Sequence, residues 1–216
     1  MPTFGFSAFL KLISLSPRRQ KSEIQKRLQP SKNGYDFHRN LKLHAHRYLY
    51  EGTALEDVLA SVSRIVKDAE KRSTAQGLAR LHTWRSENLG DLIEFPPAIY
   101  ESPRGRFKVK FTSDIGIADR GGMAIHIWNT ASPGLNAREI FAALALMNTA
   151  YRNIVPSPAS MAVLSLRNSQ LYRLTDAEDF SLIGRRVVES LEGIFEDVEH
   201  GVQLPRDDRP IAPSQF

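Results

Sequence analysis

The chain of 216 residues contains no cysteine, and this absence excludes several kinds of chemistry. Disulfide bridges, zinc sites with cysteine ligands and thiol nucleophiles are all ruled out. The absence fits a reducing compartment, and we expect a cytoplasmic protein. Long apolar runs are also missing, because no uninterrupted apolar stretch approaches the roughly 20 residues that span a bilayer. We therefore expect no transmembrane segment.

Recognisable catalytic motifs are missing too. There is no P-loop, no dinucleotide-binding glycine fingerprint and no G-x-S-x-G turn, so no serine sits in a typical nucleophile turn. His44 and His46 are two residues apart, which places them on different faces of a helix and forms no metal site. From these absences we expect no cofactor.

Positive charge is concentrated at the start of the chain. The net charge is +5, and residues 1–50 hold ten Lys and Arg against Glu23 and Asp36, whereas the rest of the chain is slightly acidic. This asymmetry favours an arm that binds polyanions, although a solvated helix face would show the same charges. The cations that we expect to contact phosphates are Arg18, Arg19, Lys21, Lys26, Arg27, Arg39, Lys42 and Arg47.

Apolar and turn-forming residues divide the chain into three parts. Residues 1–34 form a basic arm with an apolar start, which packs on the body, on a partner or on a membrane surface. Residues 35–203 form a single domain, and residues 204–216, with three prolines, form a flexible tail. The apolar segment at residues 4–28 is therefore a candidate docking surface for a protein partner or a second copy.

The periodicity within the domain predicts a helical layer followed by a sheet. Residues 35–90 repeat apolar side chains at helical spacing, including one helix that runs from Leu55 to Ala69. Residues 91–203 contain alternating or apolar strand segments, a helix that opens at Asn136, a hairpin and a last helix. We predict an α+β fold, with a mixed central sheet of about four to six strands flanked by helices.

The segment from Tyr100 to Tyr151 resembles the PD-(D/E)XK nuclease superfamily. In that superfamily an acidic residue begins the second strand, an E-x-K pair lies on the third, and a helix crosses behind the sheet. Asp114 matches the acidic position, and the E-x-K positions fall on His126 and Trp128. The resemblance covers roughly residues 74–174, and it implies a nuclease-like fold whose E-x-K motif is not kept.

The departures from the motif decide what chemistry is expected. A metal-dependent nuclease needs two carboxylates to hold Mg²⁺ and a lysine to position the attacking water. Here Lys108 and Lys110 could supply the lysine, and Glu101 or Glu94 the second carboxylate. A hydrogen-bonded strand histidine at His126 and a core or base-stacking indole at Trp128 are the other readings of the cleft.

Three functions follow from these observations. The first is a non-catalytic nucleic-acid-binding or accessory protein built on the nuclease-like fold. The second is an interaction or assembly module that docks through the N-terminal arm. The third is a divergent nuclease that uses Asp114 with Mg²⁺ or Mn²⁺.

Overall fold

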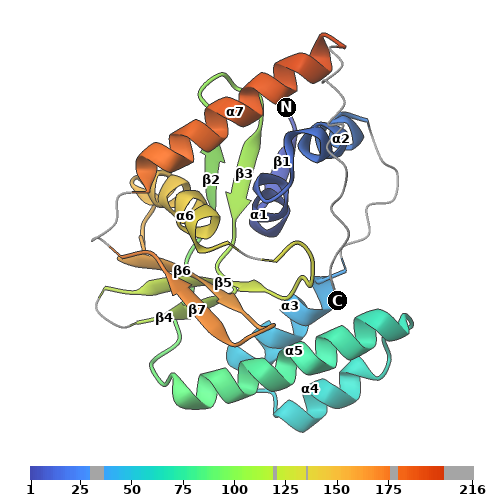
Figure 1. The fold of residues 1–216 in the computed structure, drawn as a ribbon. Helices are drawn as coiled ribbons and strands as arrows, with labels where there is room; N and C mark the ends of the chain where they lie inside the picture. The colour runs from blue at the N-terminus through green and yellow to red at the C-terminus, as the bar shows by residue number, and fades with distance from the viewer. Residues whose placement is uncertain (30–36, 119–120, 135, 176–179, 202–216) are drawn as a thin grey trace, which may run out of the picture.

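The computed structural model describes residues 1–29, 37–118, 121–134, 136–175 and 180–201, and it is α+β as predicted (Figure 1). Within these residues the helices are α1 (Phe6–Ile13), α2 (Pro17–Leu28), α3 (Arg39–Leu49), α4 (Leu55–Val62), α5 (Asp68–Glu87), α6 (Ala137–Tyr151) and α7 (Ser181–Glu199). The strands are β1 (Thr3–Gly5), β2 (Ala98–Glu101), β3 (Lys108–Phe111), β4 (Ile115–Ile117), β5 (Met123–Trp128), β6 (Ser160–Ser165) and β7 (Gln170–Arg173). Residues 204–216, predicted as a flexible tail, lie outside the described residues.

The strands form two mixed sheets that are flanked by helices. A three-stranded sheet has the order β1-β3-β2, and a four-stranded sheet has the order β4-β5-β6-β7. In the first sheet β1 runs parallel to β3, with Phe4 opposite Val109. In the second sheet β5 runs parallel to β6, with His126 opposite Val163. The chain passes from one sheet to the other between Phe111 and Ile115, and this passage carries Asp114.

The N-terminal residues belong to the body of the protein. β1 is an edge strand of the three-stranded sheet, and α1 buries Phe6, Phe9 and Leu10 in the main apolar cluster with Trp128. Of the three alternatives for the apolar start of the chain, this is packing on the body, because the apolar side chains are covered by the chain's own sheets and helices. Their burial leaves this apolar face unavailable for docking on a partner.

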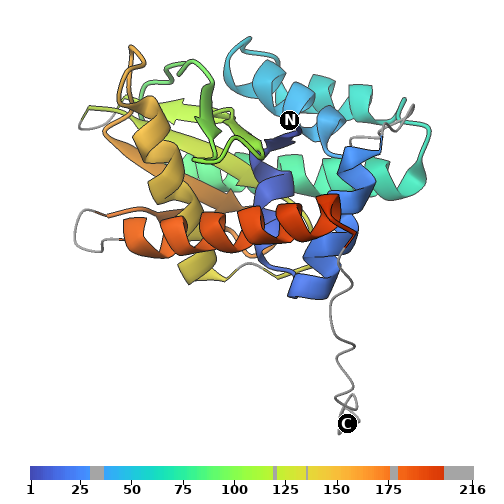
Figure 2. The same ribbon diagram turned by 90° about the horizontal axis from the view of Figure 1, so that it is seen from above.

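A second apolar cluster lies on the other side of the four-stranded sheet. There α3, α4 and α5 pack against Ile125 and Ile127, whereas Ala124 and Trp128 of the same strand face the main cluster. Figures 1 and 2 show α7 and the pair α4 and α5 on opposite sides of the molecule. The alternation along β5 thus joins two cores through one strand.

One local prediction in the helices needs correction. The helix expected from Leu55 to Ala69 ends at Val62, and α5 begins at Asp68, because Val66 is 93% exposed and has no core to bury against. Ala54 is the N-cap of α4, and no side chain of the described residues caps this helix. Asn136 does cap α6, where its side chain accepts a hydrogen bond from the Arg138 amide.

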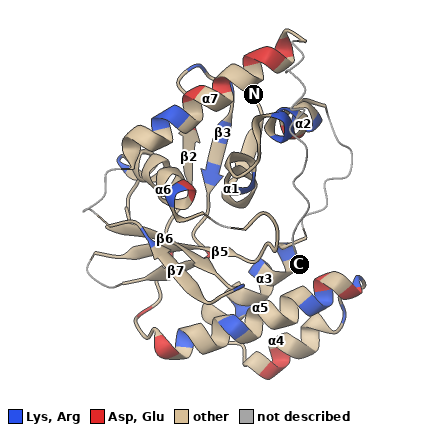
Figure 3. Cartoon of the chain, viewed as in Figure 1, with Lys and Arg blue, Asp and Glu red and all other residues tan. Residues whose placement is uncertain are grey.

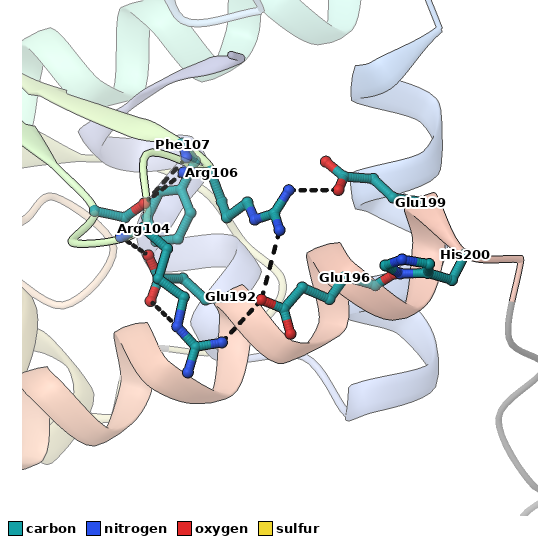
Figure 4. A network of polar contacts seen from close by, with 8 residues as sticks. Arg104, Arg106, Phe107, Glu192, Glu196, Glu199 and His200 are labelled. Atoms are coloured by element: carbon teal, nitrogen blue, oxygen red, sulfur yellow. Dashed lines mark hydrogen bonds and ion pairs between the residues drawn. The ribbon is translucent and has the colours of Figure 1, made fainter.

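The C-terminal half of α7 is held against the β2–β3 turn by ion pairs (Figure 4). Glu192 is buried and accepts a hydrogen bond from the Arg104 amide at 2.7 Å. Glu196 lies 2.8 Å from Arg104 Nη1 and 3.5 Å from Arg106 Nη2. Hydrogen bonding to Arg104 holds the pKa of Glu196 below its ordinary value. In the described part of the chain, no helix is long and apolar enough to cross a membrane.

Candidate functional site

Asp114 lies where the chain crosses between the two sheets, and its side chain is only 8% exposed. Its backbone amide donates to the carbonyl of Ile125 at 2.9 Å. Its Oδ2 atom accepts a hydrogen bond from the Ile127 amide at 2.8 Å, and its Oδ1 atom lies 3.2 Å from Lys42 Nζ. Both carboxylate oxygens are therefore used within the fold.

His126 lies beside Asp114 and is almost completely buried, with 2% of its surface exposed. Its Nδ1 atom is 3.1 Å from Asp114 Oδ2 and 3.3 Å from the carbonyl oxygen of Thr112. Its Nε2 atom is 2.7 Å from Ser7 Oγ in α1. The rings of Phe6 and Phe111 lie next to the imidazole, with centroids 5.1 and 5.8 Å away. Ser7, His126 and Asp114 are thus linked by polar contacts and lie next to aromatic rings.

The charges at this centre are balanced between Asp114 and Lys42. Burial alone would raise the pKa of Asp114, but the Lys42 charge and the hydrogen bonds from His126 and Ile127 lower it to about 2. Burial lowers the pKa of His126, and Lys42 lowers it further. At neutral pH the centre therefore holds an ionised aspartate, paired with Lys42, and a neutral imidazole.

These residues do not fit Mg²⁺. A hard cation needs several oxygen ligands, and here the Lys42 ammonium group is already bound to the Asp114 carboxylate. Glu94 pairs with His46 at 3.2 Å, and Glu101 pairs with Lys108 at 3.0 Å on the other sheet. No group of three or more His, Asp or Glu residues in the described ranges could hold a metal ion.

The other predicted catalytic and cleft residues take different positions in the fold. Lys108 and Lys110 lie on β3 of the three-stranded sheet, and the lysine beside Asp114 is Lys42 of α3. Trp128 is 2% exposed in the main core, so it is a packing residue and is not available to stack on a base. His126 is a hydrogen-bonded histidine on a strand, as one of the two interpretations of this residue predicted.

An open pocket of about 350 Å³ lies next to the Asp114 centre. Its lining residues come from α3, from the segment before β2 and from the β3–β4 connection; they are His46, Tyr50, Glu94, Phe95, Pro96, Pro97, Thr112 and Ser113. His46 bridges two carboxylates, at 3.3 Å from Glu51 and 3.2 Å from Glu94. Burial raises the pKa of Tyr50, whose hydroxyl donates to Ile93 O and accepts from Gly116 N.

Of the cations predicted to contact phosphates, those on α2 are mostly exposed. Figure 3 shows Lys and Arg on this helix in blue. Arg18 and Arg19 face solvent, Lys26 pairs with Glu23 at 2.9 Å, and the Arg27 guanidinium lies 5.2 Å from the ring centroid of Phe4. Lys21 is the exception, because it is buried and its Nζ atom has no hydrogen-bond partner among the described residues. A buried ammonium cannot reach a phosphate on the surface.

The cations on α3 are mostly used inside the protein. Lys42 binds Asp114, and Arg47 donates to Ser61 Oγ at 3.3 Å and lies 4.0 Å from Glu51. Arg39 is exposed. Of the cations predicted on this helix to contact phosphates, only Arg39 is therefore left exposed, and α2 carries the other exposed members of the predicted set.

The sequence did not predict two features of the centre. These are the contact of Ser7 with His126 and the pairing of Lys42 with Asp114. Ser7 lies 119 positions from His126 in the chain, so no local motif connects them. Gly5, directly before Phe6 and Ser7, gives no signal either, because its φ of −66° is one that any residue adopts.

No protein-family model and no curated protein matches the chain. A solved structure titled "Crystal structure of SSO0001" is similar to it over 86% of each chain, with 16% sequence identity and a TM-score of 0.33. A similarity this low carries no argument about fold or function. What the chain does has to be inferred from its own residues.

Proposed function

We propose that the chain binds nucleic acid through α2, and that its body is a nuclease-like fold without metal-dependent cleavage. The observation that carries the proposal is the exposed face of α2. Arg18, Arg19, Lys26 and Arg27 face solvent on this helix, where Glu23 is the one acidic residue. Such a face supports contacts to phosphates, which are independent of base sequence and weaken steeply with salt.

The nuclease-like part of the proposal rests on the order of elements around Asp114. The Asp114 carboxylate lies directly before β4, β5 carries His126 and Trp128, and α6 is the next element. The absence of cleavage follows from the Lys42 ammonium group, which occupies Asp114 Oδ1 and opposes the approach of a second cation. We expect no Mg²⁺- or Mn²⁺-dependent cleavage of DNA or RNA. Cleavage that disappears in an Asp114→Ala variant would instead favour the divergent nuclease.

The test is the salt dependence of binding to a labelled DNA duplex, followed by fluorescence anisotropy. Each phosphate contact contributes about 0.9 to the slope of log K against log salt for duplex DNA. Replacing Arg18 and Arg19 by Ala should weaken binding at every sequence and reduce the slope by about 1.8.

The matched control is the double substitution of Arg185 and Arg186 by Ala. These two residues are also adjacent and exposed, near the N-terminal end of α7. Their removal changes the net charge equally and should leave the slope nearly unchanged. A flat salt response in the unaltered protein, or equal losses in both double variants, would contradict binding through α2.

A further inference from the structure

Ser7, His126 and Asp114 form a hydrogen-bonded chain in the order of a serine nucleophile, its base and the group that orients the base. Ser7 Oγ lies 2.7 Å from His126 Nε2, and His126 Nδ1 lies 3.1 Å from Asp114 Oδ2. Both distances are within the range of such relays. We propose that Ser7 is an activated nucleophile that cleaves small carboxylic esters, a metal-free activity separate from nucleic-acid binding.

The partners of His126 fix the position of its proton. The two groups at Nδ1 are the Asp114 carboxylate and the Thr112 carbonyl, and each can only accept a hydrogen bond. The neutral imidazole must therefore carry its proton on Nδ1, which leaves the Nε2 lone pair free. Ser7 then donates its hydroxyl proton to Nε2, as a nucleophile donates to a general base.

The position of Ser7 in the chain suits this role. β1 ends at Gly5 and α1 begins at Phe6, so Ser7 lies in the first turn of a helix that directly follows a strand. Gly5 is the N-cap, and within the part of the chain that the structure describes no side chain caps the first turn, whose amide groups have no partner inside the helix. Uncapped amides at a helix N-terminus stabilise negative charge, including the oxyanion that forms on an attacked carbonyl.

The surroundings favour a neutral acyl group over a phosphate. Phe6 and Phe111 place apolar rings beside His126. The nearby cation, Lys42, is bound to Asp114. Because Ser7 is only partly exposed, the acyl group should be short. Simple acetyl and propionyl esters are the substrates to test first.

The reaction balances with water as the second substrate. Ser7 Oγ forms a bond to the carbonyl carbon while its proton passes to His126 Nε2. The ester C–O bond then breaks, and the leaving alcohol takes the proton from Nε2. A water molecule repeats the sequence on the acyl-serine, gives its proton to Nε2 and releases the carboxylic acid, and Ser7 regains its proton.

A fluorophosphonate probe tests the nucleophile directly, because it reacts only with activated serines. Its phosphorus forms a bond to the serine oxygen and fluoride leaves. We expect one label per chain, located on Ser7 by peptide mass mapping, and at least tenfold less labelling after Ser7→Ala. Ser22→Ala, which removes an exposed serine of α2, should label like the unaltered protein. Absence of label on Ser7 would overturn the proposal.

A second measurement uses the absence of cysteine from the chain. In a Ser7→Cys variant, His126 should favour the thiolate, which is the form that reacts with iodoacetamide. We expect alkylation at pH 7 at least ten times faster than in a Ser22→Cys variant. A rate equal to or slower than that of Ser22→Cys would show that Ser7 is unactivated or inaccessible, and either result overturns the proposal.

Discussion

At the scale of single residues, the Asp114 carboxylate joins parts of the chain that are distant in sequence. The carboxylate accepts a hydrogen bond from the Ile127 amide of β5 and contacts the His126 imidazole of the same strand. It also pairs with Lys42 of α3, and His126 links it to Ser7 of α1. Removing one partner of such a buried network leaves the others without compensation, which costs more than an exposed ion pair contributes.

This network should make the protein sensitive to acid. The folded-state pKa of Asp114 is about 2, below the ordinary value of 3.8, so its contribution is present above about pH 4 and is lost as pH falls towards 2. The shift corresponds to about 2 kcal/mol. The lowered pKa of His126 acts in the same direction from about pH 6.5 downwards, because the unfolded chain binds that proton first.

Urea unfolding across pH 7 to 3 measures this dependence. The free energy of unfolding should fall with pH in the unaltered protein and fall less steeply in an Asp114→Asn variant, which has no charge to lose at this position. If the free energy of unfolding fell equally with pH in both proteins, the Asp114 charge would not contribute to the pH dependence of stability.

The sequence located part of this centre. Asp114 could be singled out because an acidic residue between two strands fits the resembled motif, and His126 because it occupies a motif position. Lys42 was also noticed, but as a phosphate contact. Which helix approaches Asp114 depends on packing between α3 and the sheet, and nothing in the local spacing of either segment encodes that approach.

At the scale of elements, α1 shows how far amphipathic spacing can be interpreted. Its apolar residues indicate a helix with a buried face, and Phe9, Leu10 and Leu12 are indeed buried. The spacing does not say what covers the face, so a partner and a membrane remained alternatives. The strands have the same limit. Strand segments within residues 91–203 could be predicted, whereas β1 was missed, and short strands carry no information about which sheet they join.

Phe9 provides the test of α1 as a core element. It is fully buried and stacks near Phe107, with ring centroids 6.2 Å apart. Phe9→Ala should lower the free energy of unfolding by about 3–5 kcal/mol, since it leaves a cavity in the main cluster. Leu43→Ala is the control, because Leu43 is 54% exposed on α3 and its loss should change stability by less than about 0.5 kcal/mol. Equal effects would argue against a buried α1.

At the scale of the whole molecule, two apolar cores share the four-stranded sheet. Trp128 lies in the cluster with α1, α6 and α7, and Trp84 lies in the cluster with α3, α4 and α5. The chain has these two tryptophans only, so each core contains one fluorescent reporter. Since β5 contributes side chains to both clusters, neither core can lose its packing without affecting the other.

Single-tryptophan variants should therefore unfold in one transition. In Trp84→Phe the fluorescence of Trp128 reports the first core, and in Trp128→Phe that of Trp84 reports the second. For each variant, the urea midpoint from fluorescence should coincide with the midpoint from far-ultraviolet circular dichroism. Fluorescence that changes well before the circular dichroism in either variant would mean that the two cores unfold separately.

The pairing of β1 with β3 also has a consequence for synthesis of the chain. Phe4 pairs opposite Val109, so the first strand has no partner until more than 100 further residues have been made. At about 5–20 residues per second, this takes roughly 5–20 s, during which Phe4, Phe6 and Phe9 are exposed apolar residues on the nascent chain. Over that interval the N-terminal segment resembles a chaperone substrate more than a folded element, and ribosome-associated chaperones should bind it first.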